Sequence, residues 1–124
     1  MDSDDIRELD PFLQLTVVRS EFADPQDLVA LASRRGGEGH HTLAEFGRLH
    51  AEAVELLARH PDAEIRALLV RNRRLAPGPA ALREALLLGD PSSWVRSELL
   101  ELDLSVALRT RVLASLAESE ILHP

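Results

Sequence analysis

A short helical segment occurs twice in the sequence, and this repetition constrains the fold more than any other feature. When Pro61 is aligned with Pro91, apolar and arginine positions coincide in three pairs: Ile65 with Val95, Arg66 with Arg96, and Leu69 with Leu99. The apolar residues of each segment recur at the spacing of one helix face. Each segment leads into a turn near a leucine and then into a second helical pattern. Repeated pairs of helices predict stacked helical hairpins, as in a short α-solenoid.

The composition agrees with a purely helical fold. Leucine and alanine dominate the 124 residues, and aromatic residues make up only 3%. Such a chain suits helices that pack on helices better than a β-sandwich, and no stretch shows the alternation of a half-buried strand. We therefore predict one all-α domain of HEAT-like stacked hairpins over residues 10–124, with about seven helices. A flexible acidic N-terminus over residues 1–9 would precede it.

Proline signals mark where helices of this domain begin. In Asp24-Pro25 and Asp90-Pro91, an aspartate that can cap a helix precedes a proline suited to the first helical position. Asn72 is a polar stop for the helix that would begin near residue 61. These boundaries predict three units of paired helices: residues 10–33, 60–88 and 90–119.

The segment between the first two units, residues 36–59, fits neither of them. It begins as a glycine-rich loop and continues, from Thr42 to about residue 59, as the longest and most amphipathic helix expected in the chain. Thr42 and Glu45 have the spacing of a capping box, in which each side chain satisfies a free N–H group of the first turn. One face of this helix carries residues alternately three and four apart: Leu43, Phe46, His50, Ala53 and Leu57.

Two stretches carry a family resemblance. HPDAEIRALLVRNRRLAP (residues 60–77) and GDPSSWVRSELL (residues 89–100) resemble the bacterial leucine-rich variant repeats, which are close to HEAT repeats. The resemblance implies helix pairs stacked into a curved right-handed array that is used for binding. The distance from Pro61 to Pro91 is longer than the usual repeat, and residues 36–59 have no counterpart in it.

The resemblance also implies structural roles between units. In HEAT-like repeats an arginine bridges to an aspartate of the adjoining unit, and Arg66 and Arg96 hold the arginine position. Asp90 stands before Arg96 where that aspartate is expected, whereas His60 stands in the corresponding place before Arg66. The residues expected to act between repeats are therefore Arg66, Arg96, Asp90 and Asn72.

Arginine is concentrated in the middle of an otherwise acidic chain. The net charge is -7, yet residues 48–83 hold seven arginines and four acids. Guanidinium groups match the oxygens of phosphates and of acidic protein surfaces, and an exposed tryptophan is a favoured interface anchor. The arginines also suit helix ends, where the helix dipole favours cations. The candidate partner-binding residues are Arg71, Arg73, Arg74 and Trp94.

The sequence argues against catalysis and against bound cofactors. It has no cysteine, so the iron–sulfur cluster of some relatives of the repeat family is not implied, and thiol chemistry is excluded. It also lacks nucleophile-elbow, phosphate-loop and dinucleotide glycine motifs. The residues that invite a metal site are His40, His41, Glu45 and His50, but His41 precedes the expected helix and Glu45 is needed in its cap. We expect a protein that is not an enzyme and that holds no metal or cofactor.

The location and the partner follow from charge and hydropathy. No apolar run approaches the roughly 18 residues of a membrane helix, and the acidic N-terminus lacks the regions of a signal peptide, so we expect a cytoplasmic protein without membrane contact. The first interpretation is a protein-binding adaptor or scaffold. One alternative is nucleic-acid binding through the central arginines, which the net charge disfavours. Another is a structural homodimer whose seam is the helix over residues 42–59.

Overall fold

The computed structural model describes residues 16–20, 22–34, 39–76 and 78–122, and within these ranges all regular structure is helical. The predicted all-α class is therefore confirmed. Residues 16–19 are helical, and the later helices are α3 (Pro25–Ala32), α4 (His40–Phe46), α5 (Ala51–Ala58), α6 (Ala63–Arg71), α7 (Pro79–Leu88), α8 (Ser93–Glu98), the 3-10 helix η1 (Leu99–Glu101) and α9 (Val106–Leu122). None of the described helices is both long and apolar enough to cross a membrane. The predicted flexible N-terminus over residues 1–9 lies outside the described residues.

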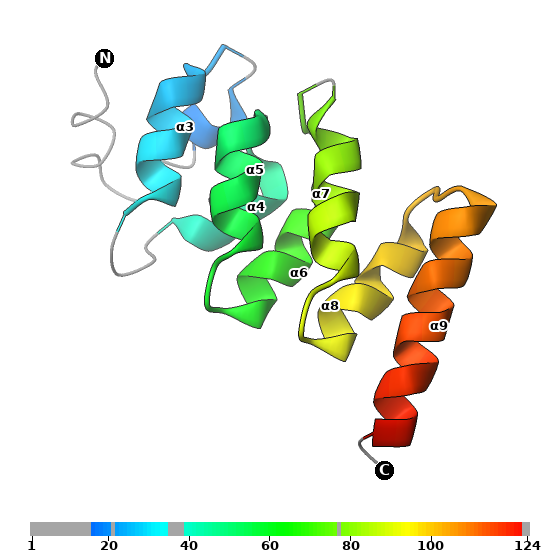
Figure 1. Cartoon of the computed structure of the whole chain (residues 1–124). Helices are drawn as coiled ribbons and strands as arrows, with labels where there is room; N and C mark the ends of the chain where they lie inside the picture. Colours follow the sequence, from blue (N-terminus) through cyan, green and yellow to red (C-terminus); the bar gives the residue numbers. More distant parts are fainter. Residues whose placement is uncertain (1–15, 21, 35–38, 77, 123–124) are drawn as a thin grey trace.

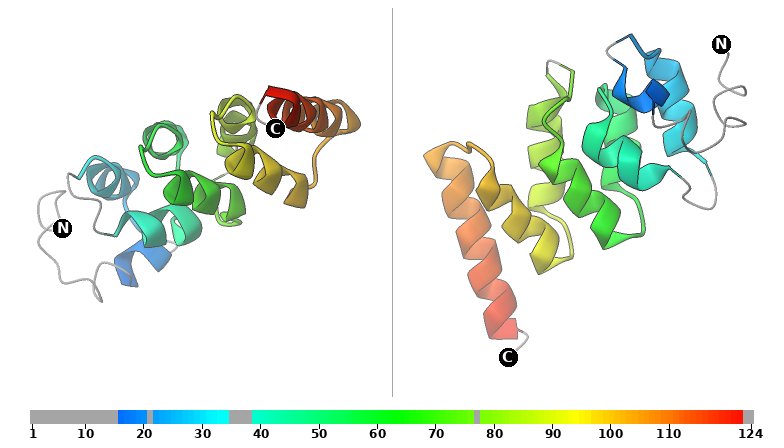
Figure 2. Two further views of the ribbon diagram at one scale, coloured as in Figure 1. Left: turned by 90° about the horizontal axis from the view of Figure 1, so that it is seen from below. Right: turned by 180° about the vertical axis from the view of Figure 1, so that it is seen from behind.

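The helices form two rows, because successive helices alternate between them. Figure 1 shows α3, α5, α7 and α9 standing side by side, and the left view of Figure 2 shows the second row of α4, α6 and α8 beside them. Within the rows, α5 packs against both α3 and α7, and α6 packs against both α4 and α8. Contacts such as those of α5 with α6 and of α8 with α9 join the two rows. This arrangement confirms the expected stack of helical hairpins.

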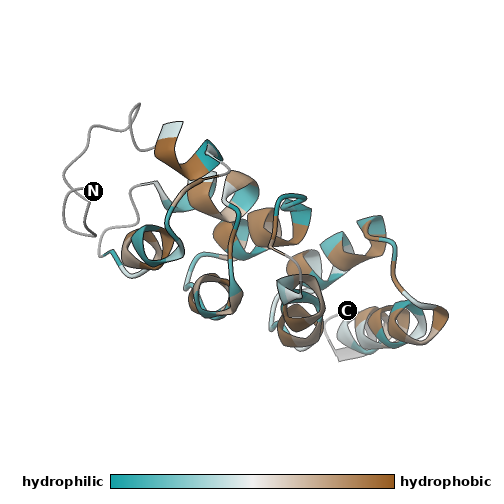
Figure 3. Cartoon of the chain, turned by 90° about the horizontal axis from the view of Figure 1, so that it is seen from above, coloured by the Kyte–Doolittle hydropathy of each residue, from teal (hydrophilic) through white to brown (hydrophobic). Residues whose placement is uncertain are grey.

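A continuous apolar core runs between the rows. Hydrophobic residues occur along the helices of both rows, and hydrophilic residues occupy most connections (Figure 3). Burial of each large aliphatic side chain contributes about 1.5–3 kcal/mol of transfer free energy. The largest fully buried side chains come from nearly every element: Val18, Leu28, Leu31, Leu43, Leu49, Val54, Leu57, Ile65, Leu69, Leu87 and Leu99.

The two repeated helices begin after their prolines and not at them. Asp62 is the N-cap of α6 and Ser92 is the N-cap of α8, so neither Pro61 nor Pro91 holds the first helical position. Each cap side chain accepts a hydrogen bond from a backbone N–H of the first turn. A proline side chain has no acceptor atom and cannot serve as such a cap. Asp90 is therefore not the cap that the sequence predicted. Both segments shift by the same amount, so their mutual alignment is kept.

The predicted long helix over residues 42–59 is wrong, because the chain breaks into α4 and α5. Gly47 ends α4 with φ −72° and ψ 141°, and residues 47–50 have no regular structure up to His50, the N-cap of α5. Thr42 lies inside α4, whose N-cap is Gly39 at φ 79°, so the predicted capping box does not form. The break is held by other parts of the chain: the Gly47 carbonyl accepts from Asn72, and the Leu49 carbonyl accepts from the Ala76 N–H at 3.0 Å.

The close packing around Gly47 can be tested by substitution with alanine. A Cβ at this position would lie 2.6 Å from the Leu43 carbonyl oxygen and 2.9 Å from Leu49 Cδ2. We expect Gly47→Ala to lower the free energy of unfolding by about 1–3 kcal/mol, the usual cost of overpacking. Gly89→Ala is the matched control, because a Cβ there meets no atom within 4 Å and Gly89 has a negative φ of −94°. Equal urea midpoints for the two variants would contradict the expected crowding.

Candidate partner-binding surface

Two of the predicted partner-binding residues come together through a third residue, Glu98. Arg71, at the end of α6, places NH2 2.7 Å from Glu98 Oε1 and Nε 3.2 Å from Oε2. Trp94, in the first turn of α8, donates its indole N–H to Glu98 Oε1 at 3.2 Å. The hydrogen bond from Arg71 is the main reason that the pKa of Glu98 is lowered, and the same bond raises the pKa of Arg71. Glu98 therefore remains ionised and fixes both side chains.

These side chains form a mixed surface over two neighbouring helices. Trp94 is 46% exposed, which is unusual for the largest apolar side chain of a folded protein. Leu68 lies three residues before Arg71 on α6, so the two side chains are neighbours on the helix surface; Leu68 is half-buried and also packs against the core. We call the group Leu68, Arg71, Trp94 and Glu98 the α6–α8 surface.

The other two predicted arginines do not join this surface. Arg74 uses its guanidinium to donate to the Arg19 carbonyl, and its backbone N–H donates to Asn72 Oδ1 at 2.7 Å. Arg73 is exposed and makes no hydrogen bond or ion pair with another residue in the described ranges. The three arginines that are close in sequence thus have three different surroundings, and they do not form one cationic patch.

Arg66 connects neighbouring units by an ion pair with Asp90. Its Nε lies 2.7 Å from Asp90 Oδ2, its NH2 lies 3.2 Å from Oδ1, and its NH1 donates to the His60 carbonyl at 2.7 Å. The Asp90 side chain is almost completely buried and also accepts from the Ser92 N–H. Arg96 has a different contact, since it donates to the Ser119 hydroxyl on α9. Arg66 and Asp90 thus link two units, and Arg96 links α8 to α9.

Asn72 joins α6 to the end of α4. Its side chain is 2% exposed, and its Nδ2 donates to the carbonyls of Ala44 and Gly47 at 2.7 and 2.8 Å. The backbone carbonyl of Asn72 accepts a hydrogen bond from Arg83 NH1 at 2.6 Å. Arg83, which the sequence placed in the basic middle segment, is buried on α7, and burial lowers its pKa. Arg83 therefore contributes no charge to the protein surface.

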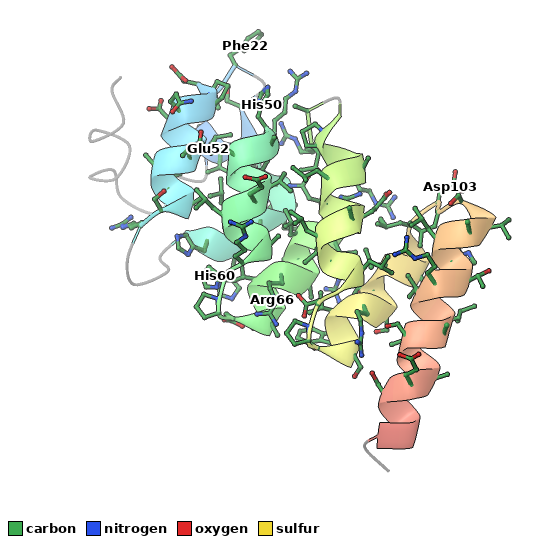
Figure 4. The ribbon with its side chains drawn as sticks, in the orientation of Figure 1. Phe22, His50, Glu52, His60, Arg66 and Asp103 are labelled. Carbon is green, nitrogen blue, oxygen red and sulfur yellow. The ribbon has the colours of Figure 1, made fainter. Side chains whose placement is uncertain are left out.

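A hollow of about 640 Å³ lies where the ends of α3, α4, α5 and α6 meet. His40, His41, His60 and Arg59 are among its lining residues. Figure 4 shows His60 at the turn between α5 and α6 and Arg66 on α6 beside it. The sequence did not predict that His40 and His60 would meet, because they are far apart in the chain.

The side chains best placed for a metal ion in the described part of the chain are His41, Asp62 and Glu64. Their ligand-type atoms all lie within 4.8 Å of one another, but all three residues are exposed. Asp62 is engaged as the cap of α6, and the N-terminal end of that helix carries a partial positive charge, which opposes a cation. We therefore assign no metal site there.

Glu98 is not among the residues predicted from the sequence, and only its contact with Trp94 follows from a local spacing. Trp94 and Glu98 are four residues apart, which places them on one face of a helix. The contact with Arg71 joins residues that are distant in sequence, and no spacing rule could have found it. Comparison of the chain with protein-family models, with curated proteins and with solved structures gives no match.

Proposed function

We propose that this protein is a non-catalytic adaptor that binds another protein through the α6–α8 surface. The observation that carries the proposal is the shared contact of Glu98 with Arg71 and Trp94, which holds an exposed aromatic ring and a guanidinium in place on neighbouring helices. Tryptophan and arginine, with tyrosine, are the residues most enriched among interface hot spots, which cluster near the centre of an interface. Because Glu98 already restrains them, a partner would lose less side-chain entropy on binding.

The charge of the surface suggests the nature of the contact. Arg71 is neutralised by Glu98, so the centre of the surface offers apolar area from Trp94 and Leu68 and little net charge. The whole chain has a net charge of -7, which favours approach of a partner with a basic rim. We propose a protein segment that packs an apolar side chain against Trp94. Membership of the leucine-rich variant repeats, a bacterial origin and a cytoplasmic location remain parts of the same proposal.

The two alternative functions have less support from the geometry. Nucleic-acid binding needs several free cations along one surface, whereas Arg71 is paired, Arg83 is buried and Arg74 binds a carbonyl. The dimer seam needed a free apolar face on one long helix. That helix is broken, and Leu43 and Leu57 are fully buried in the core of the same chain.

Trp94 offers a direct test, because it is the only tryptophan and the chain has no tyrosine. A partner captured from the native host and then purified should shift the Trp94 fluorescence to shorter wavelength in a titration. Calorimetry should show that Trp94→Ala weakens binding by about 30-fold or more, as expected for an interface hot spot. Arg71→Ala should also weaken binding, because it removes the guanidinium and leaves Glu98 held only by its hydrogen bond with Trp94.

Two controls separate this surface from the rest of the molecule. Leu113→Ala removes an exposed apolar side chain on α9, and Arg73→Ala removes the unpaired arginine next to Asn72. Both variants should bind the partner as the wild type does. The proposal fails if Trp94→Ala binds normally, or if Leu113→Ala loses as much affinity as Trp94→Ala.

A further inference from the structure

Two histidines form a chain of hydrogen bonds that connects three segments. His40, the first residue of α4, is 3% exposed, and its Nε2 lies 2.7 Å from the carbonyl oxygen of Leu31 on α3. Its Nδ1 lies 2.9 Å from His60 Nε2, in the turn between α5 and α6. His60 Nδ1 in turn lies 3.0 Å from the backbone nitrogen of Asp62. We call these contacts the histidine chain.

The backbone groups at the two ends of the histidine chain determine which ring nitrogens carry a proton. The Asp62 N–H can only donate, so His60 Nδ1 must accept and His60 carries its proton on Nε2. That proton is donated to His40 Nδ1, so His40 carries its own proton on Nε2 and donates it to the Leu31 carbonyl. Both rings are therefore neutral. An additional proton on either Nδ1 would place two donors against each other and break the chain.

The charges around the histidine chain also oppose an additional proton. Burial is the largest cause that lowers the pKa of His60, followed by the neighbouring His40; His41 and Arg66 add to this, and only Asp62 acts in the opposite direction. The remaining charged groups nearby are Arg34 and Arg59, which line the same hollow, Glu64, which pairs with His41, and Asp90, which pairs with Arg66.

We propose that the histidine chain is an acid-sensitive latch, which ties α3 and α4 to the turn before α6 at neutral pH and releases them on acidification. The sign follows from proton linkage. Once the chain opens, a histidine has its ordinary pKa of 6.5 and takes up a proton that the closed chain cannot hold. The closed form is thus most stable above about pH 7 and loses stability as the pH falls through 6.5. Release would also open the hollow that His40 and His60 line.

The tautomers can be measured directly in the wild-type protein. Long-range proton–nitrogen NMR at about pH 7.5 should show both His40 and His60 protonated on Nε2 and bare on Nδ1. His60 should then titrate below 6.5, the ordinary pKa of histidine. A proton on Nδ1 of either ring, or a His60 titration at or above pH 6.5, would rule out the latch.

Hydrogen exchange tests whether the release is local. Between about pH 7.5 and pH 5.5, and after correction for intrinsic rates, amides of α3 and α4 should lose up to about tenfold in protection for each histidine that gains a proton. Amides of α7 and α8 should change much less. Equal losses in both regions would indicate general acid destabilisation and would overturn the proposal.

Glutamine variants isolate the proton from the hydrogen bonds. His60→Gln retains a donor near the position of Nε2 but cannot gain a charge, so the pH dependence of α3 and α4 should decrease. His50→Gln is the matched control and should leave that dependence unchanged. If His60→Gln and the wild type respond identically to pH, the latch is refuted.

Discussion

Replacement of Asn72 by alanine should lower the free energy of unfolding by roughly 3–5 kcal/mol. The Asn72 amide is the donor for two carbonyls at the end of α4, those of Ala44 and Gly47, and its Oδ1 accepts from the Arg74 N–H. Alanine would leave the two buried carbonyls and the part-buried Arg74 N–H without this partner, and each unsatisfied buried group costs about 1–3 kcal/mol. Urea unfolding followed by circular dichroism would measure the loss as a lower midpoint.

Two further variants separate the hydrogen bonds of Asn72 from its volume. Asn72→Asp keeps the size of the side chain and an acceptor for the Arg74 N–H, but it places carboxylate oxygens against two carbonyl oxygens. We expect it to be at least as destabilising as Asn72→Ala at neutral pH. Arg73→Ala, at the exposed neighbouring position, should change the stability by less than about 0.5 kcal/mol. A loss below about 1 kcal/mol for Asn72→Ala would show that water replaces its contacts.

The same residue shows how far the sequence could predict this fold. The helix that ends at Asn72, its repetition after Pro91 and the aspartate cap before Pro25 were all visible as local patterns, because helix periodicity and capping depend on residues a few positions apart. The break at Gly47 was not visible in this way. Residues 42–59 have a good amphipathic pattern that favours one long helix. The Asn72 amide, just after α6, instead donates to the carbonyls of Ala44 and Gly47 at the end of the shorter helix α4.

The candidate surface was predictable only in part for the same physical reason. Trp94 and Arg71 could be chosen by residue type, but their meeting at Glu98 depends on how α6 packs against α8. Likewise Arg83 looks like a surface cation in the sequence, although its spacing from Pro79 and Leu87 on α7 matches one buried helix face. The backbone carbonyls of Leu69 and Asn72 supply its acceptors, and these become apparent only once α6 and α7 are placed together.

Loss of the Asp90 carboxylate should be comparably severe, at about 3–5 kcal/mol for Asp90→Ala. Arg66 would then keep a largely buried guanidinium with only the His60 carbonyl as acceptor, and an uncompensated buried charge is what makes the breaking of such pairs costly. The Ser92 N–H would lose its acceptor as well. Thermal and urea unfolding should both show the loss.

The ion pair of Arg71 with Glu98 is the natural comparison for Asp90. Arg71 is half-exposed in its pair with Glu98, so Glu98→Ala should cost no more than about 1 kcal/mol. A double variant, Arg66→Met with Asp90→Asn, removes the charge while it keeps an acceptor for Ser92, and it should be more stable than Asp90→Ala alone. Two outcomes would contradict this account: an equal loss of unfolding free energy for Asp90→Ala and Glu98→Ala, or a double variant that is the least stable of the three. In either case the buried charge does not couple the two units, and packing between α6 and α8 must do so instead.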